Sequence, residues 1–258
     1  MQANVDVKTV EGFGEEWSRF DQTGMPETEL NEQFDRYFAV FPFDSLPETA
    51  EGFDLGCGSG RWAKVMARKV GRLHCIDASA EALAVAKKNL AAAENVEFHN
   101  ASVAEIPLPD DSMDFGYSLG VLHHIPDTAQ GIRSCVRKIK PGAPFLVYLY
   151  YAFDNRPAWF RAVWKISDVV RRGIAALPFG LKKIATDLIA VTVYFPLART
   201  AGLLEKTGIN VESFPLSVYR HHSFYTMRTD ALDRFGTRLE QRFTRAEITA
   251  MMTPSQAE

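Results

Sequence analysis

The stretch Asp54-Leu55-Gly56-Cys57-Gly58-Ser59-Gly60 decides the fold of this 258-residue chain. It ends an apolar segment, 52–55, and precedes an amphipathic one, 61–70, so we expect a strand that turns sharply into a helix. Three glycines at alternate positions let the backbone come close to a ligand, because no Cβ blocks the approach. The free N–H groups at the start of the next helix face any anionic group there. The loop therefore predicts a nucleotide-like ligand at the first βα turn, and a tight turn without a ligand is the alternative.

Outward from this loop, short apolar runs alternate with amphipathic stretches, which is the pattern of a parallel sheet wrapped by helices. Strands are expected at 52–55, 72–76, 96–100, 113–119 and 143–151, and helices at 61–70, 81–93 and 128–138. The fold class is therefore α/β, with a doubly wound sheet. Right-handed crossovers leave a crevice at the carboxyl ends of the strands, and ligand chemistry is expected there.

Residues 154–207 break this rhythm. Trp159, Val163, Ile166 and Val170 form one helical stripe, and a second apolar helix is expected from Leu181 to Val193, with a proline on either side of it. We interpret this region as a helical lid inserted after the fifth strand; a packing helix pair without substrate contact is the alternative. The predicted domains are an aromatic and acidic arm (1–48), a cofactor-binding core (49–153), the lid (154–215) and a return to the core (216–258).

The amino-acid composition argues against several classes of function. The chain is 47% hydrophobic and 24% charged with a net charge of −3, which argues against a dedicated nucleic-acid binder. Residues 1–54 carry 13 acidic and 3 basic side chains, a net −10, whereas residues 156–206 carry 9 basic and 3 acidic ones, a net +6. The three cysteines show no CxxC spacing, so neither a disulfide framework nor a metal site is indicated. The N-terminus lacks the pattern of a secretory signal, and a cytoplasmic location is expected.

The spacing of the glycines distinguishes between the known classes of nucleotide-binding loop. A dinucleotide site needs G-x-G-x-x-G, and Arg61 occupies the position of its third glycine. No Gly-Lys-Ser/Thr follows, so a phosphate-binding Walker loop is excluded as well. A nucleotide-dependent oxidoreductase is therefore disfavoured.

DLGCGSGRW resembles the first motif of the class I S-adenosylmethionine-dependent methyltransferases, and the resemblance extends over residues 51–151. It implies a Rossmann-like sheet of order 3-2-1-4-5, with S-adenosylmethionine as cofactor. It also implies that the glycine loop holds the methionyl part and that Asp54 reaches its amino group. Asp77 matches the acidic residue that binds both ribose hydroxyls, although a helix N-cap is an alternative role that Ser79 fills equally well.

The same resemblance covers the rest of the cofactor site. Relatives often place an Asp where this chain has Ser102, so a weaker adenine contact from Ser102 is implied, with Val103 packing on the ring. SLGVLHHIPD resembles the subgroup that contains ubiquinone- and biotin-pathway methyltransferases, and Leu119 would line the pocket beside the sulfonium. The complete set of expected cofactor residues is Asp54, Gly56, Cys57, Gly58, Gly60, Arg61, Asp77, Ala78, Ser102, Val103 and Leu119.

A general base is needed only where the acceptor atom carries a proton. Histidine titrates close to neutrality, which suits that task. The candidate catalytic residues are His123, His124, His221, His222 and Tyr225. A structural role for the first two at the strand exit is the alternative.

Two further expectations concern the ends of the chain. The arm is rich in aromatic residues, and Trp17 and Phe20 are expected to shield the cofactor, unless they are plain core. In the family, a helix resembling Thr244–Met252 precedes a final pair of strands. Either residues 216–220 and 239–243 replace that pair, or the sheet lacks it and the fifth strand is an edge.

The sequence limits the class of methyl acceptor mainly by what it lacks. The chain has no Pro-Pro dipeptide, so the motif typical of adenine or glutamine methylation is absent. An apolar and cationic lid favours a small, partly apolar acceptor methylated on oxygen, nitrogen or carbon. Residues 156–206 are also candidates for peripheral contact with a membrane or a lipid-like substrate, and homo-oligomer formation stays open. The rival function is a non-catalytic S-adenosylmethionine-binding regulator.

Overall fold

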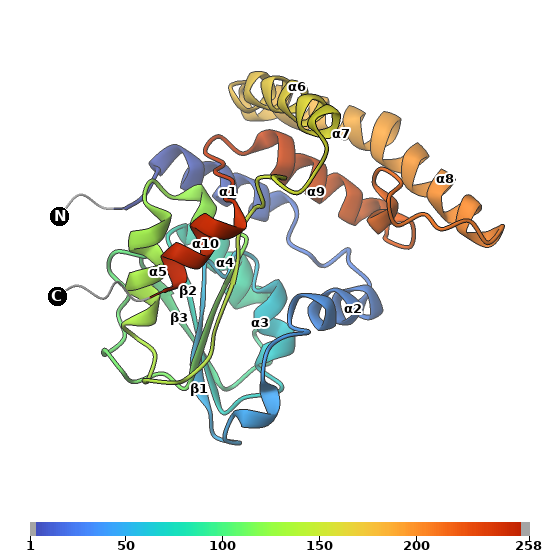
Figure 1. The fold of residues 1–258 in the computed structure, drawn as a ribbon. Helices are drawn as coiled ribbons and strands as arrows, with labels where there is room; N and C mark the ends of the chain where they lie inside the picture. Colours follow the sequence, from blue (N-terminus) through green and yellow to red (C-terminus); the bar gives the residue numbers. More distant parts are fainter. Residues whose placement is uncertain (1–3, 254–258) are drawn as a thin grey trace. The chain divides into compact units, whose positions relative to one another are not determined.

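The structure is a computed structural model that describes residues 4–253. Contacts divide the chain into two compact units. The sheet unit comprises residues 1–21, 31–157 and 239–258, and the helical unit comprises residues 22–30 and 158–238. Helix α2 (Glu27–Tyr37) begins in the helical unit and ends in the sheet unit. Figure 1 shows the order of the elements along the chain.

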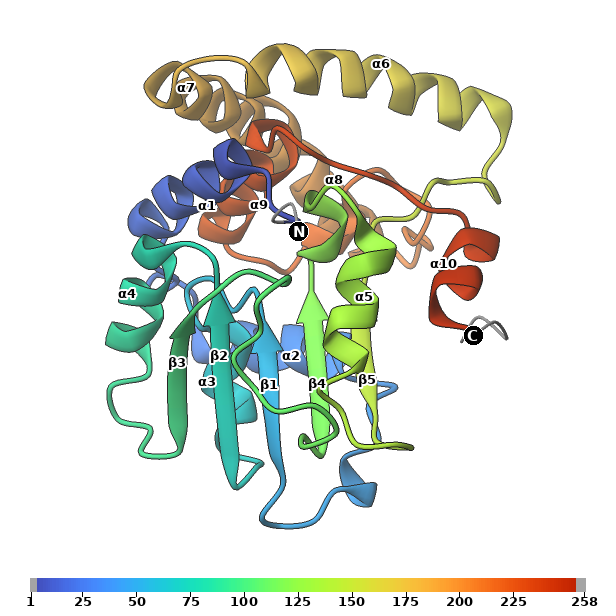
Figure 2. The ribbon, with the colours of Figure 1, turned by 90° about the vertical axis from the view of Figure 1, so that its left-hand side faces the viewer.

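Five parallel strands form the sheet, in the order β3-β2-β1-β4-β5. Their bounds are β1 Glu51–Leu55, β2 Arg72–Asp77, β3 Val96–Asn100, β4 Phe115–Leu119 and β5 Phe145–Tyr148. This order confirms the predicted doubly wound, Rossmann-like fold. The order reverses between β1 and β4, and the carboxyl ends of all five strands lie at the same edge of the sheet (Figure 2).

Helices cover both faces of the sheet. In the sheet unit they are α1 Val7–Arg19, α3 Arg61–Met66, α4 Ala80–Asn89, α5 Thr128–Val136 and α10 Arg245–Met252. Right-handed crossovers that run in opposite directions from β1 place α5 on the face opposite α3 and α4. The hydrophobic core on the α5 face joins Phe53, Leu55 and Ile76 of the sheet to Ile132 and Cys135 of α5.

The fifth strand is shorter than predicted at both ends. Pro144 lacks an N–H group and cannot extend the ladder before Phe145. Beyond Tyr148, the main chain pairs with the end of the chain instead: Phe243 N–H donates to Tyr150 O, and Ala152 N–H donates to Phe243 O, both at 2.9 Å. Tyr151 and Phe243 form a single parallel bridge.

The final pair of strands is absent from residues 4–253, so the second of the two sequence alternatives is correct. Residues 239–243, which we call the return strap, supply only that bridge, and residues 217–219 form a short 3₁₀ turn. The expected terminal helix is present as α10. Thr244 caps it in a capping box with Glu247.

The helical unit contains four helices of more than ten residues within its described part. They are α6 Ala158–Ala175, α7 Phe179–Ile189, α8 Phe195–Lys206 and α9 Phe224–Gly236. The prediction that Pro196 follows the end of the second helix is wrong. A π-helical turn at Ala190–Tyr194 joins α7 to α8, and Pro196 lies just after that turn, inside a continuous helix. The continuous segment Phe179–Lys206 is long and apolar enough, by length and composition alone, to qualify as a membrane span.

Candidate functional site

A pocket opens in the sheet unit where the strand order reverses. It holds about 950 Å³ of empty space, including its mouth. Five segments line it: the start of the chain with α1, the glycine loop between β1 and α3, the end of β2, the loop after β3, and the turn after β4. This is the crevice in which open α/β sheets bind their ligands.

The glycine loop forms one wall of the pocket. Gly56 and Gly58 have φ values of +75° and +55°, which side chains rarely tolerate. A Cβ on Gly56 would lie 2.3 Å from Val121 Cγ2, and one on Gly58 would lie 2.9 Å from Trp17 Nε1. Both positions therefore need glycine for conformation and for space. The loop is fixed from below, because Gly56 N–H donates to Ile76 O at 2.7 Å.

Asp77 holds the loop against the neighbouring strand. Its Oδ2 accepts a hydrogen bond from Gly58 N–H and its Oδ1 accepts one from Ser79 N–H, each at 2.8 Å. Ser79, not Asp77, caps α4 by accepting from Ala82 N–H. Burial raises the pKa of Asp77 above its ordinary value. A carboxylate has about four acceptor positions, so Asp77 keeps acceptor capacity toward the pocket that it lines.

Asp54 lies beneath the loop. Its side chain is buried, and burial raises its pKa to about 8. Within residues 4–253, its Oδ2 has no hydrogen-bond partner. The nearby Tyr117 hydroxyl lowers this pKa only in part, and a cationic or N–H-bearing ligand group would add a hydrogen bond at Oδ2. The pair Asp54 and Asp77 therefore fits a ligand with an ammonium group and vicinal hydroxyls.

The N-terminal segment forms the opposite wall of the pocket. Asn4 ties it to the loop before α5, because its side chain exchanges hydrogen bonds with the main chain of Asp127 at 2.6 and 2.8 Å. Phe13 and Trp17 of α1 line the pocket. Phe20 is buried and does not line it, so only Trp17 of the two expected shielding residues does.

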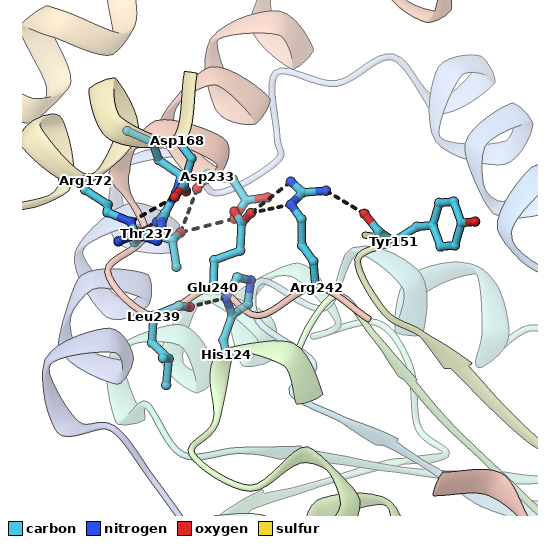
Figure 3. Close-up of polar contacts among 10 residues, drawn as sticks. His124, Tyr151, Asp168, Arg172, Asp233, Thr237, Leu239, Glu240 and Arg242 are labelled. Atoms are coloured by element: carbon cyan, nitrogen blue, oxygen red, sulfur yellow. Dashed lines mark hydrogen bonds and ion pairs between the residues drawn. The ribbon is translucent and has the colours of Figure 1, made fainter. Parts of the chain in front are cut away.

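His124 lines the pocket on the side of β4 and lies in a short 3₁₀ turn, Leu122–His124. Its Nδ1 is 2.6 Å from the carbonyl oxygen of Leu239 in the return strap (Figure 3). A carbonyl only accepts, so Nδ1 carries the hydrogen and the lone pair of the neutral ring is on Nε2. The ring of Phe13 lies 5.1 Å from that of His124.

The return strap is held by its own polar contacts. Gln241 Nε2 donates to Ile125 O at 2.6 Å, and Gln241 N–H donates to His123 O at 2.9 Å. Arg242 pairs with Glu240 at 2.8 Å and donates to Tyr151 O, as Figure 3 shows. These contacts fix the carbonyl that orients His124.

The predicted residues divide into those that line the pocket and those that do not. The lining includes Gly56, Cys57, Gly58, Arg61, Asp77, Ala78, Val103, Leu119 and His124. Asp54, Gly60 and Ser102 lie outside the lining. Ser102 Oγ accepts from Ala104 N–H at 3.3 Å in its own turn. The cofactor-binding roles themselves stay predictions.

The other candidate bases have different surroundings. His123 is fully buried and outside the pocket lining; its ring lies 3.8 Å from that of Tyr150, and burial lowers its pKa well below the ordinary value. His221, His222 and Tyr225 belong to the helical unit. There His221 Nε2 lies 2.9 Å from Glu205, and the hydroxyl of Tyr225 accepts from Gln22 N–H. Their catalytic roles stay predictions.

Sequence reasoning missed part of the lining. Asn4, Asp6 and Thr9 line the pocket and belong to no motif, and Trp62 and Ile125 line it although the motifs that contain them assigned them no role. Only the aromatic content of the arm pointed to this wall. The sequence suggested residues 239–243 only as a possible strand. No sequence pattern predicted that the carbonyl group of Leu239 contacts His124.

One further cluster could hold a metal ion. The ligand atoms of His74, Glu97 and His99 lie within 4.8 Å of one another on β2 and β3. His74 Nε2 is hydrogen-bonded to the Glu51 carboxylate at 2.8 Å, and Arg72 forms an ion pair with Glu97 at 3.3 Å. The arginine charge opposes a cation there, and none of these residues lines the pocket.

Comparison with known proteins places the site in context. Residues 53–147 match a family described as a methyltransferase domain. The chain is 28% identical over 180 residues to a ubiquinone biosynthesis O-methyltransferase of Sodalis glossinidius, covering 66% of this chain and 69% of that protein. It is 31% identical over 112 residues to a demethylmenaquinone methyltransferase of Listeria monocytogenes, covering 41% of this chain and 46% of that protein. The chain thus spans less than half the length of the second relative.

Among solved structures, the chain is similar to the YcgJ protein from Bacillus subtilis. The TM-score is 0.46 at 22% identity, covering 57% of this chain and 60% of that one. A putative methyltransferase from Bacillus halodurans gives a TM-score of 0.47 at 18% identity, covering 54% and 59%.

Proposed function

The chain carries a class I S-adenosylmethionine-dependent methyltransferase domain, and on this premise we propose that the whole protein methylates a small, partly apolar metabolite. The observation that carries the proposal is the pocket at the β1–β4 reversal, where Asp77 anchors the glycine loop. S-adenosylmethionine supplies a methyl group already activated as a sulfonium. The protein therefore mainly aligns the acceptor and removes water.

Each wall of the pocket has a task in this proposal. The carboxylate of Asp77 accepts hydrogen bonds from the two ribose hydroxyls, and the buried carboxyl of Asp54, below the loop, accepts one from the ammonium group. Trp17 and Phe13 of α1 exclude water from the cofactor side. All of these side chains belong to the sheet unit.

His124 is the residue we propose as general base. Its Nδ1–H is held by Leu239 O, so Nε2 takes the proton from an acceptor hydroxyl as the methyl group arrives. The relatives named for ubiquinone and demethylmenaquinone biosynthesis make a quinone-type precursor the first acceptor class to test. A hydroxyl on such a ring would carry the proton that His124 removes.

Calorimetric titration tests the cofactor half of the proposal. We expect S-adenosylmethionine and its demethylated product to bind, and NAD to give no heat. Asp77→Ala removes both acceptor oxygens and is expected to weaken binding by roughly a hundredfold, since two charge-assisted hydrogen bonds are lost. Absence of binding to both adenosyl compounds at millimolar concentration would overturn the proposal.

Transfer of a labelled methyl group tests the catalytic half. Dihydroxybenzene- and naphthol-type acceptors are offered with labelled S-adenosylmethionine, and label is followed in the extracted product. We expect transfer to at least one phenolic oxygen or ring carbon. Cofactor binding without transfer to any acceptor would instead support the non-catalytic regulator.

A further inference from the structure

An apolar stripe runs along the outer side of the α7–α8 helix. Its members are spaced by three, four, three and four residues, and each is between 41 and 66% exposed: Leu181, Ile184, Leu188, Val191 and Phe195. The spacing keeps all five on one side of the helix through the π-helical turn. Large apolar side chains in a contiguous exposed row mark a surface that another partner covers.

The opposite side of the same helix is already packed. Ala190, Tyr194 and Ala198 are buried against Met227 and Ala231 of α9. Asp187 is held by Arg228 of α9, with contacts of 2.9 and 3.0 Å. A transmembrane orientation would expose this polar pair and the α9 contact to hydrocarbon, which is unfavourable. The helix is therefore suited to lie on a membrane, not to cross it.

Helix α6 repeats the arrangement. Trp159, Ile166 and Val169 are 66, 67 and 70% exposed. Two exposed cations, Arg161 and Lys165, lie on the same helix. Over residues 156–206 basic side chains outnumber acidic ones by 9 to 3, the reverse of residues 1–54. Apolar side chains flanked by lysine and arginine are typical of helices that bind the interface of anionic bilayers.

We propose that the helical unit docks on the surface of a bilayer that contains anionic lipids. In this mode α6 and α7–α8 bury their exposed apolar side chains at the headgroup boundary. Their cations contact phosphate groups there, and α9 stays packed on the inner side of α7–α8. The charge excess favours a lipid surface over a second copy of the chain, because two helical units of like charge repel each other. The inference is independent of methyl transfer.

Vesicle co-sedimentation of the intact chain tests this proposal. Vesicles are made of phosphatidylcholine alone, or with roughly one part in four of phosphatidylglycerol. We expect the protein to pellet with the anionic vesicles, and to do so less as salt rises. The double variant Ile184→Glu/Leu188→Glu is expected to lower partitioning by roughly a hundredfold, because two buried apolar side chains are lost.

The controls separate docking from folding and from the cofactor site. Val40→Glu replaces an 81% exposed apolar residue of the sheet unit and is expected to pellet like the unmodified chain. Arg161→Glu/Lys165→Glu is expected to remove the preference for anionic vesicles. Circular dichroism and calorimetry with S-adenosylmethionine are expected to be unchanged in all variants.

Two results would overturn the docking proposal. One is an unmodified chain that stays in the supernatant with both kinds of vesicle. The other is a stable dimer in light scattering that Ile184→Glu/Leu188→Glu dissociates, since the stripe would then be covered by a second copy. If neither the unmodified chain nor any variant bound S-adenosylmethionine, while vesicle binding stayed intact, the result would count against the proposed function alone.

Discussion

A buried carboxyl such as that of Asp54 links folding to pH. Burial raises its pKa from 3.8 to about 8, so the folded chain holds a proton that the unfolded chain releases. Stability is therefore fully present below about pH 4 for this group and is lost as pH rises toward 8, by about 1.4 kcal/mol per pH unit at most. Burial moves the pKa of Asp77 in the same direction.

Asp54→Asn is expected to flatten this slope. Urea unfolding of the cofactor-free chain at a series of pH values measures it, with the difference between the variant and the unmodified chain as the readout. Carboxylates with lowered pKa, such as Asp187 and Asp114, act in both proteins and cancel in that difference. Parallel stability curves for the two proteins would contradict the assignment of a protonated Asp54.

The role of His124 rests on one nitrogen. His124→Asn keeps an N–H donor for Leu239 O but has no basic nitrogen, so we expect kcat to fall by about 10²- to 10⁴-fold. Cofactor affinity is expected to stay within a few-fold. The matched variant His99→Asn on β3, outside the pocket, is expected to keep its kcat. Equal losses in both variants would point to a general loss of structure.

At the scale of the element, two glycine substitutions distinguish backbone strain from a steric clash. Gly58→Ala places a Cβ 2.9 Å from the indole nitrogen of Trp17, at a φ of +55°. Gly142→Ala meets nothing within 4 Å at a φ of +82°, so it bears the strain alone. We expect both to destabilise the chain by about 1 kcal/mol or more, and only Gly58→Ala to weaken cofactor binding, by at least about tenfold. Thermal unfolding and calorimetry measure the two effects.

Elements with strong local signals were predicted well. Strands β1 and β2 differ from prediction by one residue each, because buried parallel strands bounded by turns leave a clear pattern. Strand β3 has the expected bounds although it is a half-exposed edge strand. Pro196 misled the prediction because a π-helical turn, set by packing on α9, admits proline inside a continuous helix. The contact between His124 and the return strap joins residues 115 positions apart. No local pattern encodes such a pair.

At the scale of the whole molecule, the pocket is lined by the sheet unit alone. A ligand at a hundred times its Kd stabilises the folded state by about 2.7 kcal/mol. We therefore expect S-adenosylmethionine to slow hydrogen exchange in peptides from α1, the glycine loop and β2, and to change peptides from α7–α8 much less. Mass spectrometry of the intact chain measures this. Uniform slowing throughout would show that both units open in one cooperative step.

The pairing of Phe243 with Tyr150 and Ala152 has a consequence for biosynthesis. The ribosome completes β5 long before the strap emerges, so the nascent chain must hold an unfinished strand end while the whole helical insertion is made. Such distant closure is slow, and an unpaired strand end invites association between growing chains. Correct assembly of the protein therefore depends on the return strap pairing with this strand end before another growing chain does.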